Sequence, residues 1–140
     1  MIKPKVLFLC TANSSRTQMA EGFLKSMAGE RFEVFSAGGK AGEVSPAAIQ
    51  AMKETGVDIS SQTPTDVSKC FGVRFTYVVH LCDREREREC PIFPGAIYRR
   101  KWDLENPSDS QSDVDVATRR VRNEIRRHVE EFVEEHGQTR

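Results

Sequence analysis

A chain of 140 residues is about the length of one domain. Its composition, 38% hydrophobic and 30% charged residues, is that of a globular protein and argues against a disordered or fibrous chain. The 21 basic and 21 acidic residues cancel, so no overall charge would attract nucleic acid or an anionic membrane. The apolar run at residues 6–10 is too short to cross a bilayer, and no signal-like segment precedes it. We therefore expect a cytoplasmic, soluble protein that folds as one domain over residues 1–140. A monomer is expected as well, although none of these observations requires it.

The first half of the chain alternates strand and helix signals. Residues 5–9 form a short apolar run of β-formers, which indicates a buried strand. Residues 17–28 carry apolar side chains at helical spacing, and a glycine follows as the expected end of that helix. A second strand is predicted at residues 32–36, stopped at the glycine pair 38–39.

The next element is a helix with Ser45 as its N-cap, Pro46 at its first position and Gly56 as its stop. The remaining predicted elements are strands at residues 75–81 and 96–102 and a long helix over about residues 114–135. The apolar stripe of that helix comprises Val114, Ala117, Val121, Ile125, Val129, Phe132 and Val133. Strands alternating with helices predict an α/β fold of one domain, a flavodoxin-like three-layer sandwich. Its four-stranded parallel sheet would have helices on both faces.

Cys10 and Arg16 flank the loop that joins the first strand to the first helix. Five small residues lie between them: Thr11, Ala12, Asn13, Ser14 and Ser15. Such a loop can turn its backbone N–H groups toward an anion. The helix N-terminus and Arg16 favour the Cys10 thiolate, and a guanidinium can hold two oxygens of a tetrahedral oxyanion. The spacing alone also fits a simpler interpretation, a buried cysteine with an unrelated surface arginine.

The other cysteines are less informative by themselves. Cys82 follows the third predicted strand as Cys10 follows the first, and ligands of parallel sheets bind at the carboxyl ends of the strands. Taken alone, Cys82 would be a core thiol and Cys90 a surface thiol. A zinc site of His80, Cys82 and Cys90 lacks a convincing fourth ligand, so no metal is expected. Cys70 lies outside this pattern and is expected to pack against a helix.

The Cys-x5-Arg loop after a strand resembles the catalytic loop of the low-molecular-weight protein tyrosine phosphatases. The wider stretch at residues 7–22, LFLCTANSSRTQMAEG, looks more like the branch of that family formed by the thioredoxin-coupled arsenate reductases. Similar short stretches follow at residues 35–38, 57–60, 79–82, 90–94 and 120–125. The resemblance therefore covers nearly the whole chain.

This resemblance implies an arsenate reductase, an oxidoreductase of arsenic detoxification that converts arsenate to arsenite without a bound cofactor. Residues 11–17, Arg16 and Thr17 included, would bind the oxyanion, and phosphate or sulfate would fit the same loop. Cys10 would attack arsenic, Cys82 would attack Cys10, and Cys90 would then attack Cys82. The redox-active Cys82–Cys90 disulfide would be reduced by thioredoxin, the external reductant and transient partner.

The sequence departs from the family pattern where relatives carry an aspartate, the general acid, directly before a proline. Here Asn106 precedes Pro107, and an amide cannot donate a proton as an acid. Glu105 or Asp103 could supply a weak acid in its place, and we expect weak phosphatase activity at most. A potassium ion found in relatives would fall near Asn13, Ser36, Thr63 and Asp66. The aspartate is displaced by one position in this chain, so that ion is not expected.

Two other functions stay open. A low-molecular-weight protein tyrosine phosphatase would need only Cys10 and Arg16 and would act through a Cys10 phosphoenzyme. A non-enzymatic oxyanion- or redox-responsive binding protein would hold the anion reversibly and form no disulfide. Within the reductase interpretation, glutathione or glutaredoxin remains the alternative to thioredoxin.

Overall fold

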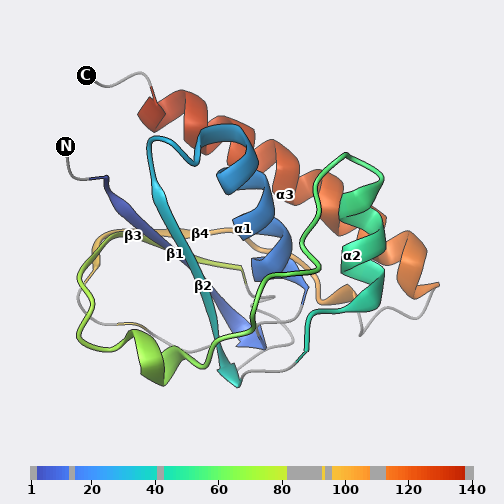
Figure 1. The fold of residues 1–140 in the computed structure, drawn as a ribbon, viewed down its shortest axis with the longest axis horizontal. Coiled ribbons are helices and arrows are strands. Elements are labelled where there is room, and N and C mark those ends of the chain that lie inside the picture. Colours follow the sequence, from blue (N-terminus) through green and yellow to red (C-terminus); the bar gives the residue numbers. More distant parts are fainter. Residues whose placement is uncertain are drawn as a thin grey trace.

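The computed structural model describes residues 3–12, 15–40, 43–81, 93, 96–107 and 113–137. Its centre is a parallel sheet with the strand order β2-β1-β3-β4 (Figure 1). The strands are β1 (Lys5–Ala12), β2 (Glu33–Lys40), β3 (Phe75–His80) and β4 (Ala96–Lys101). Val6, Leu7, Phe8 and Leu9 of the central β1 are all fully buried. A strand that is apolar on both faces can be buried in this way only inside a sheet covered on both sides. The predicted four-stranded parallel sheet is confirmed.

The two faces of the sheet are covered differently. The helical elements are α1 (Arg16–Ala28), α2 (Pro46–Lys53), the one-turn 3₁₀ helix η1 (Val67–Cys70) and α3 (Val114–Gly137). Figure 1 shows α1, α2 and α3 gathered on one side of the strands and η1 on the other. On the first side, α1 and α3 pack together over Val6 and Phe8. On the second side, Val67 and Cys70 of η1 and the Phe93 ring pack with Leu7 and Leu9.

Two strands are longer than the sequence predicts. β1 was expected to end at residue 9, and β2 at the glycine pair 38–39. In the structure Cys10 pairs with Gly38, and Ala12 pairs with Lys40. The added residues of β1 and β2 therefore pair with each other. A glycine retains the backbone N–H and C=O that form sheet hydrogen bonds, so the glycine pair does not end the strand. Cys10 therefore lies within β1 and not after it.

The helix signals were mostly right. The Ser45 hydroxyl accepts a hydrogen bond from the Ala48 N–H at 3.3 Å, as its predicted N-cap role requires. Gly56 has φ of 85°, the left-handed conformation that ends a helical segment at low cost. The prediction was wrong at Val114, which is 43% exposed. Burial of α3 starts at Ala117, one turn further along, because the first turn of the helix extends beyond the surface that it covers.

Candidate functional site

Cys10 lies beside the first turn of α1. Its side chain is fully buried, and its Sγ is 3.5 Å from the hydroxyl oxygen of Thr17. Thr17 is the second residue of α1, so this contact brings the sulfur to the positive end of the helix dipole. A thiolate is stabilised there by the helix end and by a hydroxyl that can turn its proton toward the sulfur.

Arg16, the first residue of α1, is also buried, with 2% of its surface exposed. Its Nη1 donates a hydrogen bond to the carbonyl oxygen of Leu104 at 3.1 Å. The simpler interpretation, which made this residue an unrelated surface arginine, is therefore wrong. This bond helps to orient the guanidinium, whose planar fork of N–H donors matches the oxygens of a tetrahedral oxyanion. The contact also brings the segment after β4 to the segment after β1.

The rest of the predicted oxyanion loop is described only in part. Ser15 and Thr17 are buried, and Thr11 is half-buried. Met19 N–H donates to the Ser15 carbonyl at 2.9 Å, but the Ser15 hydroxyl makes no capping bond to α1 within the described residues. The backbone of Ala12 belongs to β1. The predicted positions Asn13 and Ser14 lie outside the described residues.

The two carboxyl groups predicted as weak acids differ in their surroundings. Asp103 is exposed. Glu105 is half-buried, and its Oε1 accepts hydrogen bonds from Arg120 of α3, from Nη2 at 2.5 Å and from Nε at 3.0 Å. Leu104 lies between these two residues, and its main-chain carbonyl accepts the hydrogen bond from Arg16.

The end of β3 pairs with β1 directly before Cys10. Leu9 of β1 pairs with His80, and the N–H of Leu81 donates to the Leu9 carbonyl at 2.9 Å. The residue that precedes Cys82 is thus hydrogen-bonded to the residue that precedes Cys10. Cys82 and Cys90 themselves lie outside the described residues.

Cys70, the second buried thiol that the structure describes, is in a different environment. It is 6% exposed and packs in the apolar cluster below the sheet with Leu7, Val67 and Phe93. Burial raises the pKa of the Cys70 thiol above its ordinary range, because an apolar environment disfavours the thiolate. Cys70 was expected to pack against a helix; it is instead the last residue of η1 and packs on the sheet.

Glu21 is a buried carboxylate of α1 that forms an ion pair with Lys25, one turn further along the helix. That ion pair is present at 2.5 Å, and the Ser36 hydroxyl donates to the other carboxylate oxygen at 2.5 Å. Asp66, named for the potassium ion of relatives, accepts a hydrogen bond from the Ser68 N–H at 3.0 Å. Hydrogen bonds from Ser68 lower the pKa of the Asp66 carboxyl.

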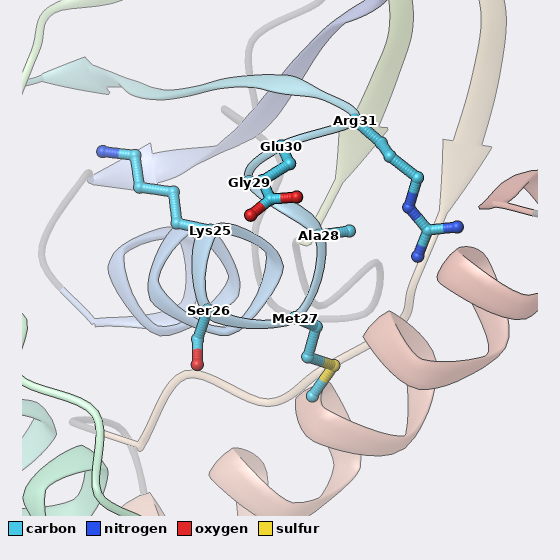
Figure 2. A pocket seen from close by; sticks show the side chains of 7 residues that line it. All are labelled: Lys25, Ser26, Met27, Ala28, Gly29, Glu30 and Arg31. Carbon is cyan, nitrogen blue, oxygen red and sulfur yellow. The ribbon is translucent and has the colours of Figure 1, made fainter.

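A hollow of about 420 Å³ lies elsewhere, at the C-terminal end of α1 (Figure 2). Seven consecutive residues from Lys25 to Arg31 line it. Cys10 contacts the opposite end of α1 through Thr17, so this hollow is separate from the candidate site. In the part of the chain that the structure describes, no helix is long and apolar enough to span a membrane.

Comparisons with known proteins agree with this geometry. The chain belongs to the low molecular weight phosphotyrosine protein phosphatase family, whose description matches residues 5–139. Within it, the chain is 38% identical over 132 residues to the arsenate reductase of Bacillus subtilis (strain 168), covering 92% of this chain and 94% of that protein. The resemblance predicted from the sequence is confirmed.

Solved structures give the same result. An arsenate reductase in the phosphate-binding state superposes with a TM-score of 0.81 at 33% identity, covering 94% of this chain and 98% of that one. An arsenate reductase in the oxidized state gives a TM-score of 0.77 at 34% identity, with 94% and 97% covered.

Proposed function

We propose that this protein reduces arsenate to arsenite with Cys10 as the nucleophile. The observation that carries the proposal is the contact between the Cys10 sulfur and Thr17 at the start of α1, next to the buried Arg16. The names of relatives support it, since relatives that are 37% and 38% identical to this chain are named arsenate reductases. The phosphate-binding state of a similar arsenate reductase supports a tetrahedral oxyanion as the ligand of this loop.

In the proposed reaction, residues 11–17 hold the arsenate and the guanidinium of Arg16 binds two of its oxygens. The Cys10 thiolate attacks arsenic and forms an S–As bond, and one arsenic-bound oxygen leaves as water. Cys82 then attacks the Cys10 sulfur. The S–As bond breaks, its electron pair stays on arsenic, and arsenite is released as the Cys10–Cys82 disulfide forms.

Regeneration needs two electrons from outside the protein. We propose that Cys90 attacks Cys82, which frees Cys10 and produces a Cys82–Cys90 disulfide for thioredoxin to reduce. The hydrogen bond between Leu81 and Leu9 supports the attack of Cys82 on Cys10, because it joins the residue before Cys82 to the residue before Cys10. A thiol relay works where thiols are kept reduced, which fits the cytoplasm. The proposed working unit is one domain of residues 1–140, acting as a monomer without nucleic acid or membrane.

The second candidate function, a phosphatase, depends on whether the residues at Asn106 and Glu105 can supply a general acid. Phosphate-ester hydrolysis needs a proton for its leaving group, and general acid catalysis contributes about 10²–10⁴ in rate. Asn106 cannot supply that proton, and Glu105 is engaged by Arg120. Arsenate can carry a proton on its own leaving oxygen. We therefore propose that phosphatase activity is weak and that reduction is the main reaction.

The test is a single turnover. Fully reduced protein is mixed with stoichiometric arsenate, free thiols are trapped, and disulfides are mapped by mass spectrometry. A Cys82–Cys90 disulfide with one arsenite released per chain is expected, and thioredoxin should then restore activity. A persistent Cys10–Cys82 disulfide would instead point to an external thiol such as glutathione. If every thiol stays free, the reductase proposal fails, and phosphate-ester turnover then separates a phosphatase from a binding protein.

A further inference from the structure

The segment between β4 and α3 is held against the candidate site from more than one side. We infer that Arg120 and Glu105 form a positioning pair that keeps residues 102–107 aligned with the Cys10–Arg16 loop. The inference rests on the proposed function, because it assigns a role in that reaction to the segment that carries Asn106. It also gives Glu105 a role other than the proton donor predicted from the sequence.

The inner contact is the hydrogen bond from Arg16 to the Leu104 carbonyl, 3.1 Å long and formed between two buried residues. It joins the oxyanion-binding arginine directly to the main chain of this segment. Any movement of the Leu104 peptide group therefore alters the partner that orients the Arg16 guanidinium.

The outer contact is made by the next residue. One carboxylate oxygen of Glu105 accepts from both Nε and Nη2 of Arg120, at 3.0 and 2.5 Å. Arg120 belongs to α3, which packs on α1 through a buried apolar interface. The ion pair thus fixes the segment to the same rigid helix pair that presents Arg16. Asn106 follows directly, so its place relative to the site depends on both contacts.

The base of the segment is fixed by ring contacts. The Trp102 ring stacks on the His128 ring of α3 with centroids 4.8 Å apart and an angle of 14° between the planes. On another side it meets the Phe8 ring at 5.7 Å. Phe8 lies two residues before Cys10 in β1. Trp102 is the only tryptophan in the chain, so its fluorescence reports on this segment alone.

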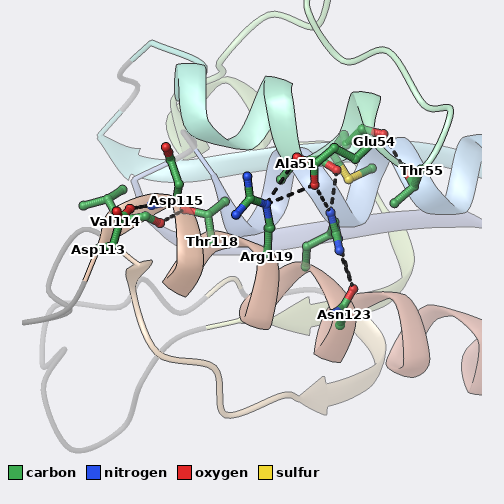
Figure 3. Close-up of polar contacts among 11 residues, drawn as sticks. Ala51, Glu54, Thr55, Asp113, Val114, Asp115, Thr118, Arg119 and Asn123 are labelled. Atoms are coloured by element: carbon green, nitrogen blue, oxygen red, sulfur yellow. Dashed lines mark hydrogen bonds and ion pairs between the residues drawn. The ribbon is translucent and has the colours of Figure 1, made fainter.

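A neighbouring ion pair provides a matched control. Arg119 precedes Arg120 on α3 and is equally exposed, with 46% against 48% of the side chain accessible. Its Nε donates to both carboxylate oxygens of Glu54, at 3.1 and 3.2 Å (Figure 3). That pair ties α3 to the end of α2, away from the segment of residues 102–107. Loss of either pair removes one exposed arginine contact, but only the Arg120 pair should affect the reaction.

The experiment compares Arg120→Met, Glu105→Gln and the control Arg119→Met in the full chain. We measure the first-turnover rate of arsenite release at saturating arsenate, the half-saturating arsenate concentration, and acrylamide quenching of Trp102. Arg120→Met and Glu105→Gln should each lower the rate by about two- to fivefold, the range expected for an exposed pair. Both should make Trp102 easier to quench and raise the half-saturating concentration by a similar factor, because Arg16, the proposed oxyanion ligand, is then oriented less well. The double variant should lose no more than either single variant.

Rescue is the sharpest part of the test. The exchange of Glu105→Arg with Arg120→Glu restores the pair and should recover part of the rate and of the Trp102 protection. If Glu105 were the acid, Glu105→Gln would lose far more rate than Arg120→Met and the exchange would not help, which overturns the inference. Equal results for Arg120→Met and Arg119→Met would also overturn it. If the wild-type chain released no arsenite, the proposed function would fail, and Trp102 quenching would still decide whether the pair holds the segment.

Discussion

Cys10 and Cys70 are both buried thiols, but their surroundings predict different reactivities. Cys10 sits at the N-terminal turn of α1 beside the Thr17 hydroxyl and next to Arg16. Cys70 sits in an apolar cluster with Leu7, Val67 and Phe93, where burial raises its pKa. The fold thus gives two equally hidden sulfurs opposite environments. When two thiols are similarly buried, the charges and dipoles around each one distinguish their reactivity.

The largest expected effect separates the two cysteines directly. Cys10→Ser should abolish arsenite release, with a loss of more than about 10³-fold, because a hydroxyl is a far weaker nucleophile at neutral pH. Cys70→Ala should leave the rate within about twofold and cost about 1 kcal/mol of stability from a small core deletion. Arsenite release and urea unfolding of both variants provide the measurement. A Cys70→Ala variant without activity would show that the distinction between the two thiols is wrong.

The next effect concerns Arg16, which directly precedes the Thr17 that contacts the Cys10 sulfur. Arg16→Lys keeps the positive charge but loses the bidentate hydrogen bonds to two oxygens of the anion and the hydrogen bond to Leu104. We expect about 10²-fold slower reduction, comparable to the loss of one donor from an oxyanion site. The affinity for phosphate, measured by calorimetry, should fall in parallel. Phosphate binding as tight as in the wild type would show that Arg16 does not hold the oxyanion.

Much of this arrangement could be predicted from the sequence. The apolar runs and the Ser45-Pro46 signal located the strands and α2, and the Cys-x5-Arg spacing located the loop. The extent of β1 could not be predicted, because it depends on pairing of Cys10 with Gly38. The short η1 also carried no periodic signal, since one turn is too short to show one.

The contacts around the site show a second limit. The partner of Arg16 is the backbone carbonyl of Leu104, 88 residues away, and a carbonyl is common to every residue type. Side-chain patterns therefore gave no signal for it. Glu105 was predicted as a weak acid because of its place beside Asn106, but its ion pair with Arg120 depends on how α3 packs. Sequence patterns predicted which residues form the candidate site, whereas the tertiary packing decided the partners of Arg16 and Glu105.

A smaller effect tests the hydroxyl beside the reactive sulfur. Thr17→Val keeps the size of the buried side chain and removes its contact with the Cys10 sulfur. A hydrogen bond to a charged group is worth at least about 1.5 kcal/mol, so reduction should slow by at least about tenfold. Thr17→Ser retains the hydroxyl and should stay close to the wild type. If both variants were equally slow, packing rather than the hydroxyl would be responsible.

The smallest effect is a difference in pH dependence between the two thiols. Because burial raises the pKa of Cys70, its unreactive protonated form persists to higher pH than for an ordinary cysteine. Iodoacetamide at neutral pH should therefore modify Cys10 and leave Cys70 intact, as followed by peptide mapping. Phosphate should protect Cys10 by occupying the loop and have no effect at Cys70. In urea the two cysteines should react alike, since both environments depend on the fold. Faster modification of Cys70 than of Cys10 in the native protein would contradict the contrast between their surroundings.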